Sequence, residues 1–181
     1  MAFPSKLEMP ERYRQATAND GEPRLVKELD ARMKKLFGRS LKLRAVSAGS
    51  CNGCEMELQA LSNVVFDLSR FGVQFVASPR HADGLVITGP VTKNMELALR
   101  KTYEAVADPK IVIAVGTCAI DGGCFKGSSE VFNGAASIVP VDLFIPGCPP
   151  HPLVILNGLL RLFTRYPLHT AGGQAVPREH K

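Results

Sequence analysis

The residues best suited to chemistry in this sequence are cysteines that lie in glycine-rich segments. Cys51 and Cys54 form a C-x-x-C pair, Cys118 ends a Gly-Thr-Cys step, and Cys148 lies in a Pro-Gly-Cys-Pro-Pro run. Four thiolates suit an iron–sulfur cluster, and a Cys-Pro step also occurs in the cluster motif of bacterial ferredoxins. The cysteine count of five argues against a disulfide framework and favours metal or redox use. We expect the fifth, Cys124, to be a small buried apolar side chain and not a ligand.

Each of the three cysteine segments follows a run of residues that is predicted to form a strand. These strands are Leu41–Ser47, Ile111–Val115 and Val141–Ile145, and two more are expected at Val73–Ala77 and Leu85–Thr88. Ligand sites of open α/β sheets lie outside the carboxyl ends of the strands. Cysteines that are far apart in the sequence are therefore expected to meet at one edge of the sheet.

Helices are expected between the strands. Helical spacing predicts a helix over Glu55–Arg70. Its apolar positions are Leu58, Leu61, Val64, Val65 and Leu68. A second helix is predicted over Asn94–Ala107, and a third from the proline run at 149–152 to about Tyr166, because proline is tolerated in a first turn. This alternation predicts a single α/β domain with a mostly parallel sheet and helices on both faces.

Composition fits one globular domain with a charged N-terminal extension. The chain has 181 residues, of which 45% are hydrophobic and 22% are charged, and no apolar run is long enough to predict a membrane helix or a signal peptide. The first 44 residues hold eleven basic and six acidic residues, whereas the rest is neutral. We expect a basic arm with an amphipathic helix over residues 1–40, the iron–sulfur domain over 41–166 and a flexible tail over 167–181.

The sequence leaves open what the basic arm contacts. Its apolar residues at helical spacing predict a helix that packs on its own domain or on a neighbour, and docking at an anionic membrane surface is the alternative. Nucleic-acid binding is not expected, because no aromatic residues interleave the basic ones.

Two other interpretations of the cysteines compete with an iron–sulfur cluster. A structural zinc site also takes four thiolates, but such sites usually pair two C-x-x-C motifs, and this sequence has one. A thioredoxin-like dithiol would also place C-x-x-C between a strand and a helix. That interpretation leaves Cys118 and Cys148 without a role.

At these residues the sequence resembles the small, electron-transferring subunit of [NiFe] hydrogenases. The resemblance is strongest to the membrane-bound, complex-I-related branch that includes formate hydrogenlyase, and it extends to the homologous 20 kDa subunit of NADH-quinone oxidoreductase. In that 20 kDa subunit the first two ligands are typically adjacent cysteines, so the C-x-x-C pair favours the hydrogenase side. The segments that carry the resemblance are 51–57, Ser78–Asp83, Gly89–Thr92, Gly116–Cys118 with Gly122-Gly123, and Ile145–Pro150.

The resemblance implies a flavodoxin-like fold that holds one [4Fe-4S] cluster through Cys51, Cys54, Cys118 and Cys148. It implies an electron relay to or from a nickel–iron large subunit, or the complex I homologue of that subunit, in which the cluster would instead serve quinone reduction. Further implied partners are a ferredoxin-like iron–sulfur subunit and membrane subunits of the complex. The chain would then be a subunit of an oxidoreductase, not catalytic alone, cytoplasmic and peripheral on the inner face of the cell membrane.

Other residues are candidates for supporting roles. Glu57 is predicted to handle protons or to contact the partner, with pairing to the helix dipole as the alternative. Arg80 and Asp83 are predicted to form an ion pair at the subunit junction or to mark a quinone pocket, with a plain surface loop as the alternative. Candidate N–H donors to the cluster sulfurs are Gly53, Thr117 and Gly147.

Overall fold

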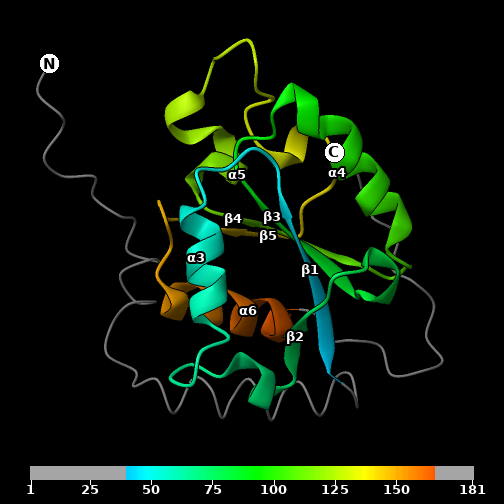
Figure 1. The fold of residues 1–181 in the computed structure, drawn as a ribbon, viewed down its shortest axis with the longest axis vertical. Coiled ribbons are helices and arrows are strands. Elements are labelled where there is room, and N and C mark those ends of the chain that lie inside the picture. Colours follow the sequence, from blue (N-terminus) through cyan, green and yellow to red (C-terminus); the bar gives the residue numbers. More distant parts are fainter. Residues whose placement is uncertain (1–39, 166–181) are drawn as a thin grey trace, which may run out of the picture.

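Five parallel strands form a single sheet in the computed structural model, which describes residues 40–165. The predicted amphipathic helix and the C-terminal tail lie outside these residues. The strands are β1 (Leu41–Ser47), β2 (Val73–Phe75), β3 (Gly84–Thr88), β4 (Ile111–Val115) and β5 (Leu143–Ile145). Their spatial order is β2-β1-β3-β4-β5 (Figure 1). This is the order of flavodoxin-like sheets, so the predicted fold class is confirmed.

Helices cover both faces of the sheet. Helices α3 (Gly53–Ala60) and α6 (Pro152–Arg165) lie on one face, and α4 (Lys93–Ala105) lies on the other (Figure 1). Because side chains alternate across a strand, β3 serves both cores: Val86 packs in the core that contains Leu58 of α3, whereas Ile87 packs in the core that contains Leu99 of α4. Burial of both faces explains why β3 and β4 are continuous apolar runs.

The helix predicted over Glu55–Arg70 is half as long in the structure. Helix α3 ends at Ala60, and a separate 3₁₀ turn, η1, covers Leu68–Phe71. The side-chain oxygen of Asn63 accepts hydrogen bonds from the backbone N–H groups of Val65 and Phe66, which replaces helical bonding with a local turn. The prediction was therefore wrong beyond Ala60, and Val64 is 91% exposed instead of buried.

The other predicted strands and helices are present, and several of them are shorter than predicted. Strand β2 stops at Phe75, β5 begins at Leu143, and α4 ends at Ala105. The segment after β4, expected to be a loop, forms a short helix, α5 (Thr117–Asp121), and Cys54, also expected in a loop, lies in the first turn of α3. Three further 3₁₀ turns are η2 (Pro79–His81), η3 (Gly123–Phe125) and η4 (Ala135–Ser137).

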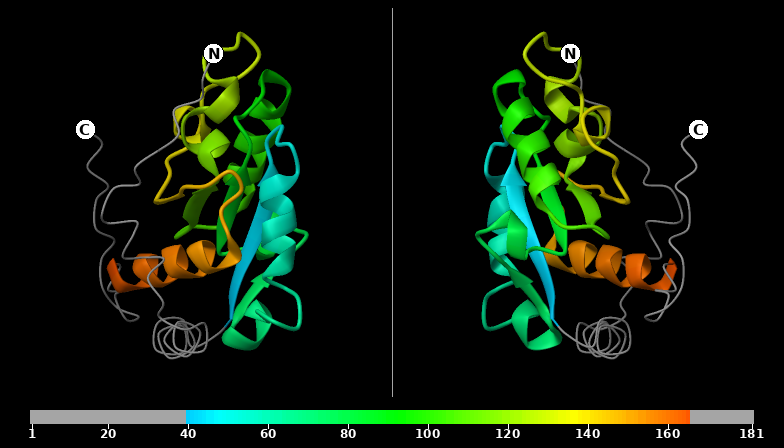
Figure 2. Two further views of the ribbon diagram at one scale, coloured as in Figure 1. Left: turned by 90° about the vertical axis from the view of Figure 1, so that its left-hand side faces the viewer. Right: turned by 90° about the vertical axis from the view of Figure 1, so that its right-hand side faces the viewer.

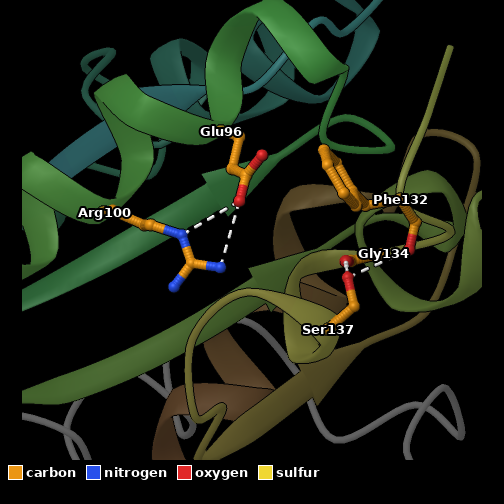
Figure 3. Close-up of polar contacts among 5 residues, drawn as sticks. All are labelled: Glu96, Arg100, Phe132, Gly134 and Ser137. Carbon is orange, nitrogen blue, oxygen red and sulfur yellow. Dashed lines mark hydrogen bonds and ion pairs between the residues drawn. The ribbon is translucent and has the colours of Figure 1, made fainter.

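The long connection between α5 and β5 packs against the start of α4. Thr92 and Val131 form an antiparallel bridge, and the N–H of Phe132 donates to the Val91 carbonyl at 2.9 Å. The Ser137 hydroxyl bonds the carbonyls of Phe132 and Gly134 at 2.9 and 2.7 Å (Figure 3). Figure 3 also shows the Glu96–Arg100 ion pair, which joins successive turns of α4 at 3.0 Å. These contacts hold the chain beyond Cys118 in place.

Helix α4 offers a matched test of the core. Leu99 is fully buried beneath α4, whereas Leu97, two residues earlier, is 62% exposed. Leu99→Ala is expected to lower the free energy of unfolding by about 2–5 kcal/mol, because it removes buried methyl groups and leaves a cavity. Leu97→Ala is expected to change it by about 0.5 kcal/mol or less. Urea denaturation measures both, and equal losses would contradict the described packing.

Candidate functional site

The ends of β4 and β5 are bonded to each other where their cysteine segments begin. The N–H of Gly116 donates to the Ile145 carbonyl at 2.8 Å, and the N–H of Thr117 donates to the Gly147 carbonyl at 2.8 Å. The Thr117 hydroxyl donates to the same carbonyl at 3.1 Å. These three bonds fix the segment that carries Cys118 beside the segment that carries Cys148.

The Cys51–Cys54 turn lies against the same loops. Asn52 adopts a left-handed conformation (φ 71°), which turns the chain into α3. Cys54 is partly buried against the core under α3 and α6, whereas Cys51 is exposed. A Cβ atom at Gly116 would lie 2.5 Å from the Cys54 sulfur, and Gly116 has φ +90°. Only glycine therefore allows the end of β4 to approach the Cys54 thiol so closely.

The four cysteines predicted as ligands act on one another electrostatically. Burial raises the pKa of the Cys54 thiol to about 11, and repulsion from Glu55, Cys118, Cys148 and Cys51 adds to the effect. Burial also raises the pKa of Cys118, with contributions from Cys124, Cys148 and Cys51. The three cysteine segments, which are far apart in the sequence, lie against one another at the carboxyl edge of the sheet. Figure 2 shows the orange segment before α6 passing beside α3.

The prediction that Cys124 is buried was wrong, whereas its exclusion from the ligands stays a prediction. Its side chain is exposed, and its thiol contributes to the raised pKa of Cys118. The chain turns back after α5, at Gly122 and Gly123, so that the fifth thiol stands beside the predicted ligand group. Sequence spacing alone did not reveal this return.

Sequence reasoning missed Glu55, which ties the cysteine turn to the sheet. Its Oε1 atom accepts hydrogen bonds from the Ser50 hydroxyl and, at 2.6 Å, from the hydroxyl of fully buried Thr88 at the end of β3. Burial opposes ionisation of Glu55, but the hydrogen bonds from Ser50, Thr88 and Ser47 outweigh it and lower the pKa of this carboxyl. An acidic residue directly after the second cysteine, in the first turn of a helix, was the available signal.

Thr88→Val tests this link. Valine keeps the shape of the buried side chain but leaves Glu55 without its hydroxyl donor from β3. We expect the free energy of unfolding to fall by about 1–3 kcal/mol, because a partly buried acceptor loses one of its two hydroxyl donors. Thr102→Val is the control, since the Thr102 hydroxyl bonds only its own helix at an exposed position. Equal effects in thermal or urea unfolding would contradict a role for the Thr88–Glu55 bond.

The other residues predicted to support the site are Glu57, Arg80 and Asp83, and they differ in burial and in bonding. Glu57 is partly buried on α3, one turn from the cysteine pair, and its proton-handling role stays a prediction. Arg80 is exposed in η2, whereas the Asp83 carboxylate accepts the backbone N–H of Lys42 at 2.9 Å. Asp83 therefore closes the start of the β1–β3 pairing, and its ion pair with Arg80 stays a prediction.

One of the three candidate N–H donors to the cluster sulfurs already bonds another group. The Thr117 N–H is used by the Gly147 carbonyl, so the expectation that it donates to a cluster sulfur was wrong. Gly53 lies close to the cysteine pair, since a Cβ atom there would be 3.6 Å from the Cys51 sulfur. The donor roles of Gly53 and Gly147 stay predictions.

The four predicted ligands are soft thiol donors, which both iron–sulfur clusters and zinc accept. Within residues 40–165, the His, Cys, Asp and Glu side chains form no group of three that would hold one metal ion. A zinc ion gathers four sulfurs about 2.3 Å from one centre. An iron–sulfur cage instead binds each cysteine at a separate iron, so its four sulfurs stay further apart.

The sheet order and the thiols at its carboxyl edge define a flavodoxin-like α/β protein with a cysteine site built from three strand ends. The family described as NADH ubiquinone oxidoreductase, 20 kDa subunit, matches residues 51–162. The chain belongs to this family, which confirms the predicted resemblance.

Relatives within the family are subunits of oxidoreductase complexes. The probable membrane-bound hydrogenase subunit mbhJ of Pyrococcus furiosus is 45% identical, over 80% of this chain and 86% of that protein. Formate hydrogenlyase subunit 7 of Escherichia coli is 44% identical over 74% of this chain, which spans 52% of that longer protein. Among solved structures, the archaeal membrane-bound sulfane sulfur reductase contains a chain with TM-score 0.62 and 33% identity, covering 75% of this chain and 72% of that one.

Proposed function

We propose that this chain holds one [4Fe-4S] cluster through Cys51, Cys54, Cys118 and Cys148 and relays electrons within a membrane-associated hydrogenase complex. The observation that carries the proposal is the packing of three cysteine segments against one another at one edge of the sheet: Gly116 lies against the Cys54 sulfur, and Thr117 bonds the Gly147 carbonyl. The similarity to hydrogenase and formate hydrogenlyase subunits supports the choice of complex.

The chain's own residues would hold and shield the group. When bound, the cluster supplies one-electron redox chemistry at a potential that the surrounding hydrogen bonds and solvent exclusion adjust. Cys54 packs against the core and anchors one corner, and Gly116 leaves room for its sulfur. Glu55 braces the turn between Cys51 and Cys54 against β3 through Thr88.

A partner subunit would complete the site. Cys51 and Cys148 are exposed, and Met56, on α3 beside the cysteine pair, is 57% exposed. Proposed ligands that face solvent at this edge support docking of a large subunit over it, since a covering partner would shield the cluster from water. We propose the nickel–iron subunit as that partner, with a ferredoxin-like subunit and membrane subunits further along the complex. Over residues 40–165, every helix is too short or too polar to cross a membrane.

A quinone-reducing role is the second candidate, because the family includes the 20 kDa subunit of NADH ubiquinone oxidoreductase. The spacing of Cys51 and Cys54 favours the hydrogenase side, since the quinone-reducing relatives typically carry adjacent cysteines there.

The test is anaerobic purification of the native complex, followed by iron and sulfide analysis and electron paramagnetic resonance of the reduced sample. We expect a reducible [4Fe-4S] signal from this chain and hydrogen-dependent reduction of a dye by the complex. Quinone reduction without dye reduction by hydrogen would select the second candidate. Zinc in place of iron, or a protein without any metal, would overturn the electron-relay proposal.

A further inference from the structure

The chain after α5 turns back onto Cys118. Gly122 and Gly123 both have positive φ values, +91° and +54°, and the N–H of Gly122 donates to the Cys118 carbonyl at 2.9 Å. A Cβ atom at Gly123 would lie 2.9 Å from the Cys118 sulfur, so the backbone directly before Cys124 passes over that sulfur. Two adjacent residues in this conformation reverse the chain within a few residues.

Local contacts hold this turn in shape. The Asp121 carboxylate accepts the N–H of Gly123 at 3.1 Å, and its other oxygen pairs with the ammonium of Lys126 at 3.1 Å. Cys124 lies between these two contacts, in η3, with an exposed side chain. Gly123, the residue directly before it, lies against the Cys118 sulfur, and the Cys124 thiol contributes to the raised pKa of Cys118. The turn therefore presents a solvent-accessible thiol next to a residue of the proposed ligand set.

We propose that Cys118 and Cys124 form a disulfide when the chain lacks its cluster, and that this bond blocks cluster insertion until it is reduced. The inference rests on the proposed function in one respect, namely that Cys118 is a cluster ligand. While Cys118 is bound to iron, its sulfur is not available to Cys124. The disulfide therefore belongs to the chain before assembly or after cluster loss.

Hydrogen peroxide is the oxidant that the proposal names. The exposed Cys124 sulfur attacks one peroxide oxygen, the O–O bond breaks, and a sulfenic acid and one water form. The Cys118 sulfur then attacks the Cys124 sulfur, and the hydroxyl group leaves with the Cys118 proton as a second water. In total, two thiols lose two protons and two electrons, and one peroxide molecule takes them up to become two waters.

The surroundings of the other cysteines favour this pair. Cys54 packs against the core and faces Gly116, whereas Cys51 and Cys148 are exposed. The turn over Gly122 and Gly123 packs on the Cys118 sulfur and keeps Cys124 beside it, whereas Cys51 and Cys54 belong to another segment. The C-x-x-C pair is the natural competitor, because such pairs also form disulfides.

The sequence allows the competing bonds to be told apart by mass. Trypsin cleaves after Arg44, Arg70, Lys110, Lys126 and Arg161. Cys118 and Cys124 then share peptide 111–126, the C-x-x-C pair shares peptide 45–70, and Cys148 lies alone in peptide 127–161. An internal disulfide makes its peptide lighter by two hydrogen atoms, whereas a bond between segments links two peptides.

The experiment treats the full-length, cluster-free chain with one equivalent of hydrogen peroxide, blocks free thiols and maps the tryptic peptides. We expect peptide 111–126 to lose two hydrogen atoms in most molecules and to regain them with dithiothreitol. Cys124→Ser removes this product without disturbing a buried residue. Bonding within peptide 45–70 instead, or links between peptides, would overturn the inference.

Reconstitution with iron and sulfide then measures the consequence. Oxidised wild-type chain is expected to incorporate several-fold less cluster than reduced wild-type chain. For Cys124→Ser, the same oxidation is expected to lower cluster incorporation much less. Equal losses in the two chains would overturn the blocking role. If reduced wild-type chain takes up no cluster at all, the proposed function fails, whereas the disulfide is still judged by its mass.

Discussion

Replacing Cys148 by serine is expected to abolish or strongly weaken the [4Fe-4S] signal in the electron paramagnetic resonance spectrum of the reduced complex. Serine offers a harder oxygen donor in place of a soft thiolate, and iron–sulfur cages depend on thiolate ligands. Loss of residues that merely support metal ligands already lowers metal affinity by about 10–100-fold. Loss of a ligand is therefore expected to lower cluster occupancy by at least about 10-fold.

Cys124→Ser is the matched control for Cys148→Ser. Both side chains are exposed, so neither substitution is expected to disturb the core. Anaerobic preparation keeps the thiols reduced, and under these conditions Cys124→Ser is expected to retain the signal. If the two variants lose the signal equally, the assignment of the four ligands is wrong.

Gly116→Ala is the second substitution with a large expected effect. The added Cβ atom would lie 2.5 Å from the Cys54 sulfur, and the backbone there has φ +90°. With φ 90° and ψ 152°, residue 116 lies in a region essentially confined to glycine, so alanine there costs about 1–3 kcal/mol, and the contact with sulfur adds to this. Because the Gly116 N–H also bonds the Ile145 carbonyl, displacement of residue 116 would separate the Cys54 and Cys148 segments. We expect loss of most of the bound iron, measured per chain in the purified complex.

Gly127→Ala separates backbone strain from the contact with sulfur. Gly127 has φ +81°, close to that of Gly116, but a Cβ atom there would meet nothing within 4 Å. This control is expected to lower the free energy of unfolding by about 1–2 kcal/mol and to keep its iron. Iron retained in Gly116→Ala at the level of Gly127→Ala would show that the approach of residue 116 to Cys54 does not matter for the cluster.

Patterns that depend on neighbouring residues were predictable from the sequence. Apolar runs at 85–88 and 111–115 predicted strands buried on both faces, and both strands are present. The pattern failed where a side chain competes for backbone hydrogen bonds. Asn63 ends the helical segment with a local turn, although Val64 and Val65 keep helical spacing.

The sequence by itself determined the fold class, and it predicted that the segments of Cys51, Cys54, Cys118 and Cys148 meet at one edge, because parallel strands end at a common edge. The tertiary structure alone decided how the strand ends meet. The Thr117 N–H donates to the Gly147 carbonyl, and Glu55 accepts a hydrogen bond from Thr88. The chain after α5 brings Cys124 back beside Cys118. Such contacts depend on the positions of segments that share no local pattern, and hydrogen bonds and thiol contacts act only over a few ångströms.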